Sequence, residues 1–281
     1  MKDTMEDPIN QAVFLSPHYD DAVLSCGGTL NLLRRKNISC SVITLFAGSP
    51  TGELSTFATW FHGVWKLPYD ATAYRREENR KALIALNAQE LSLDFQSSIY
   101  RRDPSTGTIL YNTKGDVFGG NWKDDDSLLF DLIGRCRELL THKGDFYLIA
   151  PLGVGNHIDH LLTQTAASHL SQELEDAKLT YYEELPYATQ SEAVPIALRR
   201  QSPPPQTSVL VPLSEEDLKA KYVASKQYQS QLEATAGAVG ISIEEIINYG
   251  KKLGQASGLN FTERFWFTDS HIAEQFSLAT Q

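Results

Sequence analysis

The sequence predicts an α/β fold that is Rossmann-like, with a mostly parallel sheet, helices on both faces and an irregular C-terminal extension. Short runs of apolar and β-branched residues alternate with longer amphipathic segments along most of the chain. The apolar runs are continuous, as expected for strands that are covered on both faces. The segments between them are long enough to hold crossover helices, which favours parallel strands joined by helices.

The first half of the chain carries the more regular pattern. Residues 12–16 are apolar and predict a first strand, and the β-branched run 38–46 predicts a second. Residues 22–35 have apolar side chains at helical spacing and lead into three consecutive cations, which favour a helix C-terminus. The same criteria predict strands at 91–95 and 146–151 and helices at 74–87, 128–142 and 159–174.

The second half is less regular. A long helix is predicted from Ser214 to about residue 235, because acidic residues fill its first turn after a capping serine. A short helix is expected to open at Ser242. The remaining apolar runs predict strands at 179–182, 208–211 and 263–268.

We expect one domain over residues 1–281, with a core at about 10–182 and the extension at about 183–281. Residues 48–71, with Trp60, His62 and Trp65, and residues 100–126 are expected to be long loops. Loops of this length in a compact domain are usually functional, so their aromatic and polar side chains are candidates to shape a ligand pocket. Within them, Tyr100 and Arg101 are predicted to contact substrate.

The composition narrows the choice of partners. The formal net charge of −10 disfavours nucleic acid and anionic membranes, whose phosphates such a surface repels. No apolar run approaches the roughly 18 residues of a membrane span, and the polar start of the chain lacks a signal-peptide pattern. Three separated cysteines suit a reducing compartment. We therefore expect a cytoplasmic protein with a small-molecule partner.

The segment from Ser16 to Asp21 lies where the first predicted strand meets the first predicted helix. In open α/β sheets, ligands bind outside the carboxyl ends of the strands. His18 and Asp21 are three residues apart, so a turn can aim both at one point, and Asp20 lies between them. The alternative is that the aspartates cap the helix and that His18 bonds to nearby backbone.

A second segment strengthens the functional interpretation. Residues 155–160 follow the predicted strand 146–151, and His157 and His160 are the two histidines of this chain that lie within three residues of each other. The alternative is again capping, with Asp159 at the helix start. Two histidine-bearing caps at matching sheet positions are a less probable coincidence than one shared site.

Two histidines and one carboxylate with open positions are the ligands of a catalytic zinc site. The best trio is His18, Asp21 and His160, for one Zn²⁺ ion or another divalent transition metal. A closed structural site would take a fourth protein ligand, usually cysteine, and none is placed for it.

The two motifs together resemble the PIG-L/LmbE-like family of zinc-dependent N-acetylglucosamine deacetylases, and the resemblance extends over nearly the whole chain. It rests on His18–Asp21 and His157–His160. Three further fragments are similar to elements of the family. Arg75–Glu78, followed by Ala82 and Leu86, resembles its R-x-x-E helix, and Tyr181–Glu183 resembles its late strand. Lys221, Ala224 and Tyr228–Gln231 resemble its C-terminal helix.

The resemblance implies a role for each motif residue. It makes His18, Asp21 and His160 the zinc ligands and Asp20 the general base. His157 would stabilise the oxyanion or protonate the leaving amine, and Asp159 would orient a histidine. Arg75 would contact substrate, although it is equally compatible with a surface ion pair to Glu77 or Glu78.

This sequence departs from the family pattern at four positions: Tyr19, Ala22, Gly155 and Ile158. The family commonly has Pro in place of Tyr19, Glu in place of Ala22 and Pro in place of Ile158. Some members have Tyr in place of Gly155. None of the four is an expected ligand or base. A missing tyrosine at Gly155 would leave zinc and His157 to stabilise the oxyanion.

The resulting hypothesis is a zinc-dependent deacetylase that converts an N-acetylglucosamine-type sugar or conjugate to an amine and acetate. Three rivals stay open: a zinc amidase of another N-acylated small molecule or thiol-sugar conjugate, a non-catalytic sugar-binding relative, and a phosphoacceptor receiver domain. The histidines and the length argue against the last of these. A homo-oligomer is compatible with the sequence.

Overall fold

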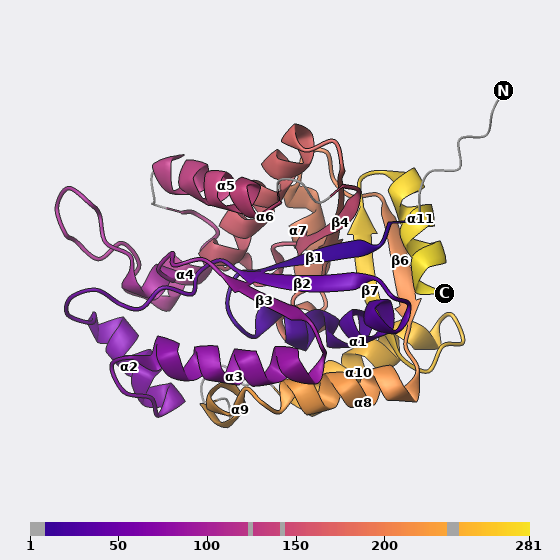
Figure 1. The fold of residues 1–281 in the computed structure, drawn as a ribbon. Coiled ribbons are helices and arrows are strands. Elements are labelled where there is room, and N and C mark those ends of the chain that lie inside the picture. The colour runs from indigo at the N-terminus through magenta and orange to yellow at the C-terminus, as the bar shows by residue number, and fades with distance from the viewer. Residues whose placement is uncertain (1–8, 123–125, 141–143, 235–241) are drawn as a thin grey trace.

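The computed structural model describes residues 9–122, 126–140, 144–234 and 242–281. Its centre is a seven-stranded sheet in the order β3-β2-β1-β4-β5-β7-β6 (Figure 1). The strands are β1 (Gln11–Ser16), β2 (Ser39–Thr44), β3 (Gln89–Ser92), β4 (Phe146–Pro151), β5 (Ala177–Tyr182), β6 (Thr207–Pro212) and β7 (Thr262–Phe267). The first five run parallel, and β7 pairs antiparallel with both β5 and β6.

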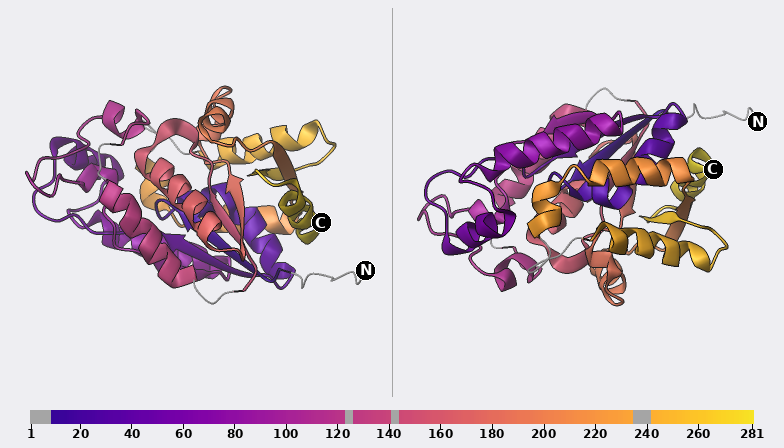
Figure 2. Two further views of the ribbon diagram at one scale, coloured as in Figure 1. Left: turned by 90° about the horizontal axis from the view of Figure 1, so that it is seen from above. Right: turned by 90° about the horizontal axis from the view of Figure 1, so that it is seen from below.

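Helices cover both faces of this sheet, as predicted. In Figures 1 and 2, α5 (Asp126–Leu140) and α6 (Ile158–Glu173) lie on one face, and α1 (Asp21–Arg35), α3 (Ala71–Ala85) and α8 (Glu215–Ser225) lie on the other. Strands β1 and β4 are buried along almost their whole length, which explains their continuous apolar sequences. The mixed α/β fold with a mostly parallel sheet is therefore confirmed.

The register of β1 and β4 fixes where the two histidine motifs meet. These strands are parallel neighbours, with Ala12 opposite Tyr147 and Phe14 opposite Ile149. Each is followed at its carboxyl end by one motif and then by a helix, α1 or α6. Neighbouring parallel strands end at the same edge of a sheet, so segments about 140 residues apart in the chain come together there.

The segment after Tyr182 adds two strands, β6 and β7, to the same sheet and contributes several helices. They include α7 (Ala193–Arg200), α9 (Gln229–Ala234), α10 (Ile243–Gln255) and α11 (Ser270–Thr280), together with the short turn η3 (Tyr187–Thr189). Helix α11 packs on β6. One sheet thus runs through both parts of the chain, while the division at about residue 182 stays a prediction.

The predicted helix from Ser214 to residue 235 is wrong in one respect, because the structure breaks it into α8 and α9. The break places the Tyr228 side chain in the interior, where its hydroxyl lies within hydrogen-bonding distance of two acceptors, the Tyr19 carbonyl at 3.0 Å and Asn79 Oδ1 at 2.9 Å. The ends predicted at His142 and about residue 235 lie outside the described residues.

The prediction of two unstructured loops is also wrong in part. Residues 48–71 contain α2 (Thr56–Trp65), which Ser55 caps by accepting from the backbone N–H of Ala58. Residues 100–126 contain the short helix α4 (Lys114–Phe118), and η1 (Ser98–Tyr100) precedes it. These elements lie beyond the ends of β1–β3, on the side opposite the C-terminus (Figure 1). Helices α7 and α11 were not predicted at all.

No helix in the described ranges combines the length and the apolar character needed to cross a bilayer.

A buried ion pair ties the C-terminal segment to α1. The ammonium of Lys221 lies 2.6 Å from Glu263, and both side chains are buried. Glu263 also accepts hydrogen bonds from the backbone N–H groups of Gly28 and Thr29 and from the Thr29 hydroxyl. Because α1 begins at the first histidine motif, this contact supports the helix that carries the site.

Replacing Glu263 with alanine is expected to lower the free energy of unfolding by about 3–5 kcal/mol, because a buried ammonium loses its partner. Urea unfolding followed by circular dichroism measures the change. Lys178→Ala is the control, since its pair with Asp145 spans 3.7 Å at the surface and is expected to matter by less than about 1 kcal/mol. Equal effects of the two substitutions would contradict this account.

Candidate active site and metal centre

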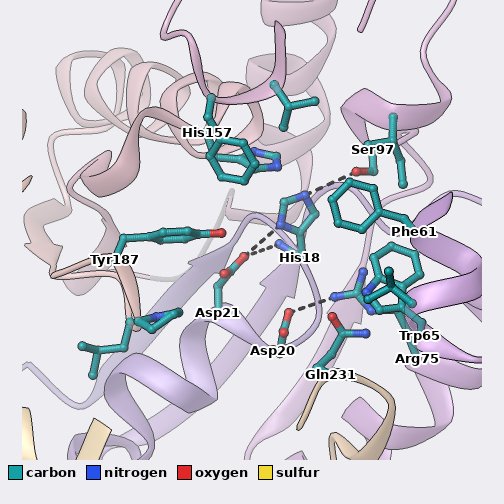
Figure 3. A pocket seen from close by; sticks show the side chains of 16 residues that line it. His18, Asp20, Asp21, Phe61, Trp65, Arg75, Ser97, His157, Tyr187 and Gln231 are labelled. Atoms are coloured by element: carbon teal, nitrogen blue, oxygen red, sulfur yellow. Dashed lines mark hydrogen bonds and ion pairs between the residues drawn. The ribbon is translucent and has the colours of Figure 1, made fainter. Parts of the chain in front are cut away.

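A cavity that is partly open to solvent lies at the edge of the sheet where β1 and β4 end (Figure 3). Its wall combines both histidine motifs with side chains from α2, α3, α4 and the segment after β5. The residues that line it are His18, Asp20, Asp21, Phe61, Val64, Trp65, Arg75, Ser97, Ile99, Val117, Phe118, His157, Leu185, Pro186, Tyr187 and Gln231.

The three predicted metal ligands converge below this cavity. Asp21 Oδ2 lies 3.2 Å from His18 Nδ1 and 3.4 Å from His160 Nε2. Donor atoms from all three residues lie within 4.8 Å of one another, close enough to share one ion. The backbone N–H of His18 also donates to Asp21 Oδ2 at 2.8 Å, which holds the carboxylate in the turn.

The residues present fit a cation. His160 Nε2 is fully buried and makes no hydrogen bond within the described part of the chain, an arrangement that is costly unless something else satisfies the nitrogen. Burial alone would lower the pKa of His160, but Asp21 and Glu184 outweigh burial and raise the pKa to about 10. Likewise, His160 and His18 hold the pKa of Asp21 well below its usual range despite burial. The pocket therefore favours positive charge beside Asp21.

Asp159 contacts the same cluster from the other side. Its Oδ2 lies 2.8 Å from His18 Nε2 and accepts from the Ser98 backbone N–H at 3.0 Å. Its Oδ1 accepts from Arg101 at 2.5 Å. Although burial opposes it, Arg101 and His18 hold the pKa of Asp159 well below its usual range, so this carboxylate is ionised and orients His18.

A second group of potential ligands consists of His18, His157 and Asp159. Arg101 already neutralises Asp159, and its guanidinium would repel a second cation placed there. The group of His18, Asp21 and His160 is therefore the better cation site.

Asp20 lies beside the ligand trio without belonging to it. Its Oδ1 accepts from Arg75 at 3.0 Å, and its side chain faces the cavity (Figure 3). Burial raises the pKa of Asp20, an effect that Arg75 opposes and that Asp21 adds to. A buried carboxylate whose pKa is raised in this way is suited to take up and release a proton.

His157 has its tautomer constrained by the backbone. The backbone N–H of Asp159 donates to His157 Nδ1 at 3.1 Å, so a neutral ring carries its proton on Nε2. Phe118 packs edge-on against this ring, with the centroids 5.0 Å apart. Burial lowers the pKa of His157 well below its usual value. His157 is therefore a neutral hydrogen-bond donor at the cavity wall.

Glu184 is a residue that the sequence did not single out. Its buried carboxylate lies 3.2 Å from His160 Nδ1 and accepts from the backbone N–H groups of residues 152–154. It thereby fixes the ring of His160 and the loop before the second motif. The fragment Tyr181–Glu183 marked the strand but stopped one residue short, and Glu183 itself binds Arg264 and Trp266.

The predicted substrate contacts fall in different places. Arg75 lines the cavity and pairs with Asp20, while Glu77 pairs with Arg80, so the surface ion pair considered for Arg75 is absent among the described residues. Tyr100 is buried and its hydroxyl lies 2.7 Å from His62 Nε2. Arg101 serves Asp159 instead of facing the cavity. Direct substrate contact by Tyr100 and Arg101 stays a prediction.

Comparison with known proteins shows which family this chain is similar to. The model of the PIG-L family, described as GlcNAc-PI de-N-acetylase, matches residues 13–171. The 2'-N-acetylparomamine deacetylase of Niallia circulans is 28% identical over 273 residues, which span 92% of this chain and 90% of that protein.

Solved structures give the same result. The zinc-inhibited form of teicoplanin deacetylase Orf2 superposes with a TM-score of 0.78 at 25% identity, covering 91% of this chain and 97% of that one. The A40926 pseudoaglycone deacetylase Dbv21 gives a TM-score of 0.74 at 25% identity, covering 92% and 97%.

These relatives are deacetylases, which cleave the C–N bond of an amide, and this chain is an enzyme of the same class. The family match extends over more than half of the 281 residues and includes both histidine motifs. The chain therefore belongs to the PIG-L family of de-N-acetylases.

Proposed function

We propose that this protein is a zinc-dependent deacetylase that hydrolyses the acetamide of an N-acetylated amino sugar or sugar conjugate to an amine and acetate. The carrying observation is the buried Nε2 of His160, which has no hydrogen-bond partner among the described residues and lies 3.4 Å from Asp21, beside a cavity with the Asp20 carboxylate in its wall. The names of the relatives, which act on 2'-N-acetylparomamine and teicoplanin, support an N-acetylated sugar-type substrate. A cytoplasmic location and a homo-oligomer stay predictions.

His18, Asp21 and His160 would hold the metal, with Asp159 and Glu184 orienting the two imidazoles through their other nitrogens. A zinc ion in this position supplies a Lewis acid that polarises the acetamide carbonyl and makes water more acidic. Two histidines and one carboxylate suit zinc, and a relative, teicoplanin deacetylase Orf2, has been solved in a zinc-inhibited form.

Asp20 would act as the general base. It faces the cavity, belongs to no ligand group, and has a raised pKa because it is buried. As water attacks the carbonyl carbon, Asp20 takes a proton from it, and Arg75 keeps the carboxylate pointed into the cavity. The proton held on Asp20 then goes to the nitrogen of the leaving amine.

His157 would stabilise the oxygen that becomes negative during the attack. Because the neutral ring has its proton on Nε2, it donates a hydrogen bond without first being protonated. The sequence allowed two functions for His157, stabilising the oxyanion or protonating the leaving amine. In this proposal His157 stabilises the oxyanion, and Asp20 delivers the proton to the amine.

The proposed reaction is tested by measuring amine and acetate release from N-acetylglucosamine, 2'-N-acetylparomamine and an N-acetylated glycopeptide. We expect turnover of at least one, its loss after dialysis against a chelator, and its recovery when one equivalent of zinc is returned. Full activity in the thoroughly demetallated protein would refute the metal assignment. Hydrolysis restricted to N-acyl amino acids would instead favour a different amidase.

Asp20→Asn is expected to retain zinc and the wild-type fold but to lose about 10²–10⁴-fold in kcat, because an amide cannot accept the proton. Bound zinc is counted by atomic absorption, and kcat comes from acetate release. Asp94→Asn is the matched control, since that side chain is 84% exposed and does not line the cavity. Near-wild-type kcat in Asp20→Asn would remove Asp20 as the base.

Zinc binding is expected to release protons and to strengthen as the pH rises. The pKa of His160, raised to about 10 by Asp21 and Glu184, means that this ring is protonated near pH 7 in the metal-free protein, and hydrogen bonds to Asp159 and Asp21 raise the pKa of His18 as well. Zinc binds the deprotonated ring, so its affinity rises about tenfold per pH unit for each proton displaced.

Calorimetric zinc titrations between pH 6 and 7.5, in buffers of different ionisation heat, measure this proton release. His271→Ala, which changes an exposed histidine, is the control and should bind zinc normally. A binding heat that is independent of the buffer would contradict the expectation.

A further inference from the structure

Gly155 and Tyr187 form an unusual contact at the cavity wall. Gly155 has φ +84°, a conformation that favours glycine. A Cβ atom on this residue would lie 2.7 Å from Cγ and 2.9 Å from Cβ of Tyr187. The tyrosine ring thus lies directly against the backbone of residue 155, and any side chain at that position would displace it.

Other rings hold Tyr187 in this position. His160 packs edge-on to it, with centroids 5.6 Å apart at 80°, and Phe118 is tilted against it at 6.0 Å. The ring lines the cavity, and in Figure 3 the hydroxyl points toward the space bounded by Asp21, His18 and His157. This hydroxyl has no hydrogen-bond partner among the residues that the structure describes.

We propose that the Tyr187 hydroxyl is a catalytic hydrogen-bond donor, which binds the acetamide oxygen and stabilises it as it becomes negative. The inference rests on the deacetylase function proposed above. No bond is made or broken at Tyr187, and its proton stays on the phenol throughout. Tyr187 and His157 then approach the reacting oxygen from two sides of the cavity.

The geometry points to the hydroxyl and not merely to the ring. Contacts with Gly155, His160 and Phe118 involve the ring and Cβ of Tyr187 and not its hydroxyl, so a phenylalanine would pack equally well there. A phenolic O–H directed into a substrate cavity without a protein partner is satisfied when a ligand oxygen arrives. Although residue 155 has no side chain, His157 is therefore not the single residue of this chain that could donate a hydrogen bond to the acetamide oxygen. A tyrosine from the segment after β5 occupies the space instead.

Tyr187→Phe tests the hydroxyl with the ring retained. We expect kcat for the N-acetylated sugar to fall about 10²–10³-fold, as when one oxyanion donor is removed, with KM, zinc content and melting temperature little changed. Tyr222→Phe is the matched control, because Tyr222 is an exposed residue on α8 outside the cavity wall. A kcat within threefold of wild type would overturn the inference while leaving the deacetylase function intact.

A binding measurement tests the same donor without turnover. A methylphosphonamidate of glucosamine carries tetrahedral oxygens where the acetamide oxygen would be, so the donor should favour it. We expect Tyr187→Phe to weaken this analogue by a factor similar to the fall in kcat/KM, and to leave glucosamine binding unchanged. Equal affinity of the two proteins for the analogue would overturn the inference. If the wild type neither turns over substrate nor binds the analogue, the proposed function is wrong and the inference falls with it.

Gly155→Ala provides a second route to the same donor. The added methyl group pushes the Tyr187 ring out of place, so kcat should fall in the wild-type background and much less in Tyr187→Phe. Melting temperature and zinc content separate this effect from backbone strain at positive φ. Fully additive losses in the double variant would show that residue 155 does not act through Tyr187, and would count against the assignment.

Discussion

The parallel pairing of β1 with β4 is the constraint on which the whole site depends. It brings the carboxyl ends of two strands, separated by more than a hundred residues of chain, to one edge of the sheet. His18, Asp20 and Asp21 come from one of these ends, and His157, Asp159 and His160 come from the other. A shift of register by a single residue would turn the strands' side chains to the opposite faces and move the imidazoles apart.

The charges at this edge are organised in two layers. Asp21 lies between the rings of His18 and His160, and each ring is held from behind by a second carboxylate, Asp159 or Glu184. Arg101 balances Asp159, and three backbone N–H groups surround Glu184. Asp21, which lies between the two rings, is therefore the carboxylate placed to share a cation with both of them.

Much of this could be predicted because the motifs are local and the strand pattern is strong. Strand 146–151 agrees with the structure at both ends, and the trio of His18, Asp21 and His160 meets as expected. Glu184 and Tyr187 could not be predicted, because their importance depends on distant partners. Nothing near them in sequence distinguishes Glu184 from Glu183, or Tyr187 from Tyr182. Helix α2 was missed because Thr56–Trp65 has no Asp, Glu, Lys or Arg side chain to mark a solvent face and is rich in aromatic and β-branched residues, which have low helix propensity.

The position of Glu184 has a consequence for how this enzyme can diversify. The residue lies at the start of the same short stretch that supplies Leu185, Pro186 and Tyr187 to the cavity wall. Its carboxylate simultaneously anchors the imidazole of His160. Substitutions or insertions that remodel this stretch for a new sugar would therefore disturb metal retention as well. Evolution of selectivity should proceed more readily through α2 and α4, whose side chains face the same space without holding a ligand.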